Sequence, residues 1–172
     1  MEIELQPASI NDKPVLRNLL ELYQYDFSEY ENSDIDEHGL YGYRYLDHYW
    51  TDPNRYAYLV KVDGILAGFA MLRVIHESPG NPIHSVAEFF VMRKYRRRGV
   101  GREVARRLFD LFPGRWRIEE EKSNLPAQAF WHEVIDDYMQ GNFEEMHQHD
   151  TEWVGLVQLF RTEVGDPDLD MD

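Results

Sequence analysis

Glu88–Phe109 reads EFFVMRKYRRRGVGREVARRLF, and this stretch joins an apolar run, a basic loop and a helical pattern. The apolar run belongs to Val86–Met92 and is typical of a buried strand. After the loop, apolar residues recur at helical spacing until Pro113-Gly114 ends the pattern. These apolar positions are Val104, Leu108, Leu111 and Phe112. The order strand, loop, helix is the basis of the fold prediction.

The centre of the loop, Arg96–Gly101 (RRRGVG), has the form R-x-x-G-x-G and leads directly into the predicted helix. Glycines let the backbone approach a ligand, and the amides at a helix N-terminus attract phosphate oxygens. We therefore interpret the loop as a pyrophosphate site. The alternative is a tight turn followed by a solvated basic face. Neither a Walker loop nor an early G-x-G-x-x-G loop is present, which argues against nucleotide hydrolysis and hydride transfer.

Charge is distributed unevenly along the 172 residues, whose formal net charge is −14. Asn18–Tyr43 holds seven acids and no Lys or Arg, whereas Arg93–Arg107 holds eight basic residues and one acid. We expect an anion near the basic stretch. The overall negative charge opposes nucleic acid and anionic membranes as partners, because like charges repel at range.

The chain has no cysteine, which excludes disulfides, thiolate metal sites and a cysteine nucleophile. His147 and His149 could share one strand face, but no further ligands stand at recognisable spacing, so we expect no metal. No apolar run approaches the ~18 residues that cross a bilayer. The start, MEIELQPAS, lacks a basic and apolar leader. We expect a soluble, cytoplasmic protein.

The remaining patterns predict a strand, two helices, three strands, a helix, a strand, a helix and two strands. We expect strands at 3–5, 55–62, 65–74, 86–92, 116–118, 143–149 and 153–161, and helices at 14–23, 41–50, 104–112 and 126–138. Asp63-Gly64 is a strong hairpin signal between two of the strands. We expect one domain over 1–164 and an acidic, frayed tail over 165–172.

Two segments carry a resemblance to a known family. VMRKYRRRGVG followed by REVARRLF resembles the acetyl-CoA signature of GNAT acetyltransferases, and Asn124–Trp131 (NLPAQAFW) resembles the family's N-x-x-A-x-x-F-Y segment. The resemblance implies an α/β (α+β) GNAT fold, with a mixed, mostly antiparallel sheet of about seven strands flanked by about four helices. It covers nearly the whole chain.

The resemblance implies transfer of an acetyl group from acetyl-CoA to a primary amine of a small molecule or peptide. Transfer would be direct, in a ternary complex, by a monomer or homodimer. Trp131 stands where many members carry a tyrosine proposed as the general acid, and an indole cannot deliver a proton as a phenol can. This keeps open a non-catalytic acyl-CoA-binding or sensing domain. A nucleic-acid module using Arg96–Arg98 conflicts with the net charge.

The resemblance also assigns the cofactor-binding residues, with Phe90 and Val91 on pantetheine, the amides from Arg97 to Arg102 on pyrophosphate, and Asn124 at the pantetheine or acetyl region. The full set is Phe90, Val91, Arg96, Arg97, Arg98, Gly99, Val100, Gly101, Arg102, Asn124 and Phe130.

For catalysis, Glu88 is the leading candidate base because it lies in the strand beside the predicted cofactor. Alternatively, the Glu88 carboxylate pairs with a neighbouring cation or faces solvent and has no catalytic role. Tyr138 is a candidate proton donor, although a tyrosine at the end of an apolar helix stripe is more often core. The acidic segment Asp26–Glu37 would favour a cationic amine if it lines the acceptor cleft. Otherwise it is a solvated loop.

Overall fold

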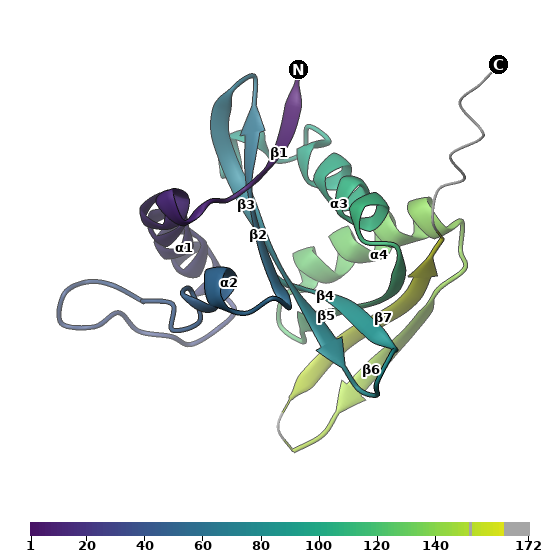
Figure 1. Cartoon of the computed structure of the whole chain (residues 1–172). Helices are drawn as coiled ribbons and strands as arrows, with labels where there is room; N and C mark the ends of the chain where they lie inside the picture. Colours follow the sequence, from purple (N-terminus) through teal and green to yellow (C-terminus); the bar gives the residue numbers. More distant parts are fainter. Residues whose placement is uncertain (152, 164–172) are drawn as a thin grey trace. The chain divides into compact units, whose positions relative to one another are not determined.

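The computed structural model describes residues 1–151 and 153–163. These residues form seven strands in the order β1-β2-β3-β4-β5-β7-β6, together with four α-helices (Figure 1). The pairings are antiparallel for β1–β2, β2–β3, β5–β7 and β6–β7, and parallel for β4–β5. The predicted mixed, mostly antiparallel sheet with flanking helices is therefore confirmed. The predicted tail at 165–172 lies outside the described residues.

The chain divides into two compact units. The first comprises Met1–Val74 and Val86–Val104, and the second Ile75–Ser85 and Ala105–Asp172. The elements in chain order are β1 Ile3–Pro7, α1 Lys13–Phe27, α2 His48–Thr51, β2 Arg55–Val62, β3 Ile65–His76, β4 Pro82–Val91, α3 Val100–Leu111, β5 Gly114–Glu121, α4 Leu125–Met139, β6 Glu144–His149 and β7 Val154–Thr162. Short 3₁₀ turns span Ile10–Asp12 and Arg93–Tyr95.

In the first unit, β2 and β3 form the predicted hairpin. Asp63 and Gly64 have φ values of 51° and 74°, as a type I′ turn requires. At the other edge of β3, the Met92 amide donates to the Ala67 carbonyl over 2.8 Å. A Cβ at Gly68 would lie 2.0 Å from the Phe90 carbonyl oxygen, so only glycine permits this approach.

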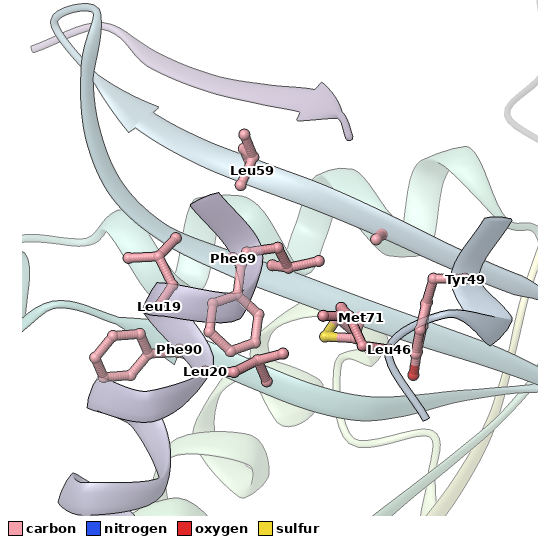
Figure 2. Close-up of a cluster of buried hydrophobic side chains, with 10 residues drawn as sticks. Leu19, Leu20, Leu46, Tyr49, Leu59, Phe69, Met71 and Phe90 are labelled. Atoms are coloured by element: carbon pink, nitrogen blue, oxygen red, sulfur yellow. The ribbon is translucent and has the colours of Figure 1, made fainter. Parts of the chain in front are cut away.

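Helix α1 packs its apolar face against this part of the sheet. Figure 2 shows Leu19 and Leu20 of α1 in one buried cluster with Phe69, Met71 and Phe90. Each of these side chains is buried. The helix is preceded by the 3₁₀ turn, in which both the amide and the hydroxyl of Ser9 donate to Asp12. The core thus fixes α1 against β3 and the end of β4.

The helix predicted at 41–50 is wrong in extent, because only His48–Thr51 is helical. The amides of Tyr41 and Gly42 instead donate to the Glu21 carboxylate, each over 2.8 Å, and Gly42 has a φ of 69°. The positive φ of Gly42 takes the backbone out of the right-handed helical region, so a helix cannot run through this position. The other differences are extensions, since β4 begins at Pro82 and β5 runs to Glu121.

In the second unit, Ile83–Ser85 of β4 pairs in parallel with Arg115–Arg117 of β5, and β6 and β7 continue the sheet as an antiparallel hairpin. Its core centres on the ring of Phe109, whose centroid lies 5.0 Å from those of both Trp116 and Phe160. Among the described residues, none of the helices combines the length and apolar character needed to span a membrane.

Candidate active site

Glu88 in β4 is the centre of the candidate site in the first unit. Its half-buried carboxylate accepts two hydrogen bonds from tyrosine hydroxyls. Tyr23 of α1 donates to Oε2 over 2.7 Å, and Tyr43 of the following loop donates to Oε1 over 3.0 Å. Each carboxylate oxygen therefore has its own donor, and the two donors come from different segments.

Burial raises the pKa of Glu88 above its usual value, and the two tyrosine hydrogen bonds oppose this increase because they stabilise the charged form. The negative charge of Glu31 also raises the Glu88 pKa, and Arg73 lowers it. Burial, followed by the Glu88 charge, raises the pKa of the Tyr23 and Tyr43 hydroxyls, which therefore stay protonated as donors. Glu88 is thus a carboxylate whose basicity is increased and whose orientation is fixed.

Aromatic rings enclose the Tyr23 side of this site. The Tyr23 ring makes edge contacts with Phe69 at 5.6 Å and Phe90 at 5.8 Å between centroids, and it lies 5.5 Å from Phe27. Phe90, a predicted pantetheine contact, is itself buried. The rings limit water near Glu88, which accounts for the dominant effect of burial on its pKa.

The loop segment 28–47 carries Tyr43 and is attached to the first unit at further points. Glu21 of α1 accepts the amides of Tyr41 and Gly42, and Lys13 forms an ion pair with Asp47. The acids of this segment lie on a loop that borders Glu88 through Tyr43. Among the acids of this segment, Glu31 is close enough for its charge to raise the pKa of Glu88.

The structure separates the basic residues of the predicted phosphate loop into two groups. Arg96 donates to Asp26 and, over 2.7 Å, to the Val91 carbonyl, and Arg93 also pairs with Asp26. Arg96 is thus committed to contacts within the protein, and the Val91 carbonyl is engaged with it. Arg97 and Arg98 are exposed. Arg97 and Arg98 can therefore supply positive charge to a ligand.

The backbone of the loop has the conformation that its glycines favour. Arg97 and Gly99 have φ values of 58° and 81°, and a Cβ at Gly99 would meet nothing within 4 Å. Gly99 is therefore required by backbone angle rather than by packing. Helix α3 begins at Val100, which is buried, and the first amides of a helix have no acceptor within it. Val100 and Gly101 belong to this first turn.

The predicted residues of the second unit lie around α4. Asn124 is buried and caps the helix, with its Oδ1 accepting from the Ala127 amide over 3.1 Å. Phe130 makes a T-shaped contact with Trp131, which is 6% exposed. The Tyr138 hydroxyl donates to Asp110 over 2.6 Å, and burial together with this hydrogen bond raises its pKa. That bond favours a packing role for Tyr138 over proton donation.

Sequence reasoning missed two functional candidates and one buried carboxyl group. It did not assign roles to Tyr23 and Tyr43, which lie 65 and 45 residues from Glu88 in sequence. It also missed Glu120 of β5, which is 4% exposed and whose oxygens have no hydrogen-bond partner in the described part of the chain. No local pattern identifies any of the three, although a tyrosine-rich segment between 23 and 49 was a visible signal.

The comparisons with known proteins agree with this geometry. Residues 17–135 match the family model for the acetyltransferase (GNAT) family, and the chain belongs to that family. Membership in this family supports acetyltransferase activity. No functionally curated protein matches the chain in sequence.

Solved structures share the fold at low sequence identity. An acetyltransferase from Thermus thermophilus has a TM-score of 0.68 at 18% identity, covering 94% of this chain and 97% of that one. The aminoglycoside acetyltransferase AAC(6')-Ib in complex with coenzyme A and kanamycin has a TM-score of 0.63 at 14% identity, covering 93% and 95%. The ribosomal-protein-S18-alanine N-acetyltransferase from Escherichia coli has a TM-score of 0.58 at 14% identity, covering 99% and 100%.

Proposed function

We propose that this protein transfers the acetyl group of acetyl-CoA to a primary amine of a small molecule or peptide. The observation that carries the proposal is Glu88, a half-buried carboxylate with a raised pKa in the strand that leads into the R-x-x-G-x-G loop. An attacking amine must lose a proton, and a carboxylate of increased basicity can accept it directly or through water. Membership in the acetyltransferase family supports the same reaction.

The phosphate loop fits the diphosphate of coenzyme A. Gly99 supplies the positive φ, the first turn of α3 supplies amides, and the exposed Arg97 and Arg98 supply charge. We further propose that Phe90, Gly101 and Arg102 bind the cofactor beside this loop, and that Asn124 and Phe130 of the second unit are also cofactor-binding residues. The loop needs no metal, because it offers positive charge and donors itself.

The reaction is direct. The amine nitrogen forms a bond with the acetyl carbonyl carbon, the carbon–sulfur bond breaks, and Glu88 takes the proton that the nitrogen loses. The thiol product has a pKa of about 8.5 by analogy with cysteine, so sulfur leaves readily as a thiolate near neutral pH. A dedicated acid is therefore less necessary, and Trp131 at the expected tyrosine position does not prevent turnover.

The acidic loop beside Glu88 favours an acceptor that is cationic. Two of the structural relatives are described with amine acceptors of different kinds, an aminoglycoside and a protein alanine. We propose a cationic amine because the acids of segment 28–47 attract positive charge. An amine panel monitored by thiol release tests the proposal, and thiol release that depends on an amine is the expected result.

The second candidate is a non-catalytic acyl-CoA-binding domain, which the buried Trp131 favours. Coenzyme A binding without transfer to any amine would support it. Gly99→Glu tests the cofactor loop shared by both functions and should abolish coenzyme A binding. Arg98→Ala should weaken binding and reduce its salt dependence. Arg96→Ala is the matched control for charge, because Arg96 is held by Asp26 and Val91, and it should change salt dependence less.

A further inference from the structure

The Glu88 carboxylate accepts hydrogen bonds from two tyrosine hydroxyls, one on each oxygen. The donors to Glu88 come from α1 and from segment 28–47, whereas Glu88 itself lies in β4. Packing alone does not require these hydroxyls, because phenylalanine would fill the same space. Each hydroxyl instead satisfies one oxygen of a carboxylate that burial would otherwise drive toward its neutral form.

We infer that Tyr23 and Tyr43 are positioning residues for Glu88, which keep its carboxylate ionised and aimed while making its basicity depend on the placement of segment 28–47. This inference rests on the proposed function, in which Glu88 is the base. It goes further because it assigns a role to two residues that the proposed function leaves unused.

The two tyrosines are held in place by different contacts. Tyr23 belongs to α1, and its ring is held by contacts with Phe69 of β3 and Phe90 of β4. Tyr43 lies on a loop that is attached to α1 by two hydrogen bonds, which the Tyr41 and Gly42 amides donate to the Glu21 carboxylate. Displacing this loop would remove the Tyr43 donor and leave the Tyr23 donor in place. Glu88 would then be a stronger base, but with a smaller ionised fraction at a given pH.

Other charged and titratable groups also act on Glu88, so the tyrosine effect must be separated from theirs. The charge of Glu31 raises the Glu88 pKa and that of Arg73 lowers it, while burial has the largest influence. Tyr49 also senses the Glu88 charge and lies beside Tyr43 and Arg55. Tyr→Phe substitutions remove only the hydroxyl and leave these neighbours unchanged. The facing groups are Tyr23, Glu31, Tyr43, Tyr49 and Arg73.

The test measures the titration of Glu88 directly in Tyr23→Phe and Tyr43→Phe. The Glu88 carboxyl carbon is followed by NMR in protein with labelled glutamate, and its resonance is assigned by its loss in Glu88→Gln. Each substitution should weaken the ionisation of Glu88 roughly tenfold, as expected for one hydrogen bond to a charged group. The effect should be larger for Tyr23, whose bond is shorter. Tyr25→Phe is the control, because Tyr25 lies on the same helix and is 70% exposed.

An unchanged Glu88 titration in both variants would overturn the inference, even if their melting temperatures fall, because the tyrosines would then be structural only. If the titration shifts, the acid side of the rate-against-pH profile should shift by the same amount in each variant. A shifted titration with an unshifted rate profile would overturn the positioning role. Failure of the proposed function would look different. In that case Glu88→Gln would keep the wild-type rate, while Tyr23→Phe and Tyr43→Phe would still shift the NMR titration of Glu88.

Discussion

Glu88 and Glu120 both lie in strands and are at least partly buried, but the hydrogen-bond donors around the two carboxyl groups differ. Glu88 has a tyrosine donor for each oxygen. Glu120 has no hydrogen-bond partner for either oxygen within the described residues, and burial raises its pKa to about 8. The nearby Gln158 side chain offsets part of that increase, although its amide nitrogen donates to Glu145 and not to Glu120, and the charges of Glu145 and Glu119 add to the increase.

The difference shows what makes a buried carboxylate useful for chemistry. Burial alone favours the neutral acid, which can donate a proton but cannot accept one. A protonated Glu120 could donate to Gln158 Oε1, a buried acceptor that is also without a partner among the described residues. The tyrosine hydroxyls of the Glu88 site stabilise the ionised form of the carboxyl group against the effect of burial. The comparison therefore supports the proposal that Glu88 is the base, and it favours a neutral structural role for Glu120.

The largest expected effect is on turnover, which should depend on Glu88 and not on Glu120. Glu88→Gln should lower turnover by ~10²- to 10⁴-fold, the usual cost of losing a positioned base, with coenzyme A affinity nearly unchanged. The rate should recover at alkaline pH, where the amine is already deprotonated. Glu120→Gln, the matched substitution, should leave turnover near that of the unmodified protein. Rate measurements across pH with one accepted amine make the comparison, and a wild-type rate for Glu88→Gln would remove its catalytic role.

The second effect concerns stability and pH at Glu120. The pKa is about 8 in the folded state against an ordinary value of 4.5, so the folded state binds the proton more tightly. The resulting stabilisation is complete below about pH 4.5 and is lost as pH rises toward about 8. The loss is at most about 5 kcal/mol. Denaturant unfolding at several pH values should show this decline, and Glu120→Gln should flatten it. An equal decline in the variant would contradict the neutral role.

Most of the fold could be predicted because each element has a local signal. The hairpin at Asp63-Gly64 and the stripe of α4 depend on neighbouring residues only. The environments of Glu88 and Glu120 depend instead on contacts between distant segments. The sequence therefore offered Glu88 as a base by its place in the strand, but not the tyrosines that hold it. For the same reason, the commitment of Arg96 to Asp26 was not predictable.

The third effect is a loss of stability when alanine replaces a glycine at which two strands approach closely. A Cβ at Gly68 would lie 2.0 Å from the Phe90 carbonyl oxygen, and one at Gly155 would lie 2.2 Å from the Glu120 carbonyl oxygen. Alanine at either position should lower the free energy of unfolding by about 3 kcal/mol, because the obstructing atom is backbone. Gly80→Ala is the control, since its Cβ meets nothing within 4 Å and only its φ of 77° is strained. It should cost about 1 kcal/mol.

Gly68→Ala should in addition weaken coenzyme A binding, because Phe90 is a proposed pantetheine contact on the displaced strand. Gly155→Ala acts on the strand that carries Glu120 and should change the pH dependence of stability instead. Calorimetry for stability and titration with coenzyme A separate these outcomes. Equal losses in all three alanine variants would show that backbone angle, and not close approach, determines the cost.

The smallest effect concerns Tyr138, a third tyrosine that donates to a carboxylate. Its partner Asp110 is exposed, unlike Glu88, so the same kind of bond contributes less here. Tyr138→Phe should lower the free energy of unfolding by about 1 kcal/mol, the net value of one hydrogen bond, while its ring contact with Phe109 is retained. Turnover should be unchanged, because a hydroxyl whose pKa is raised and whose proton is held by Asp110 is a poor acid. Unfolding and rate measurements on the same variant decide the point. A clear loss of turnover with unchanged stability would instead restore Tyr138 as the proton donor to the departing sulfur.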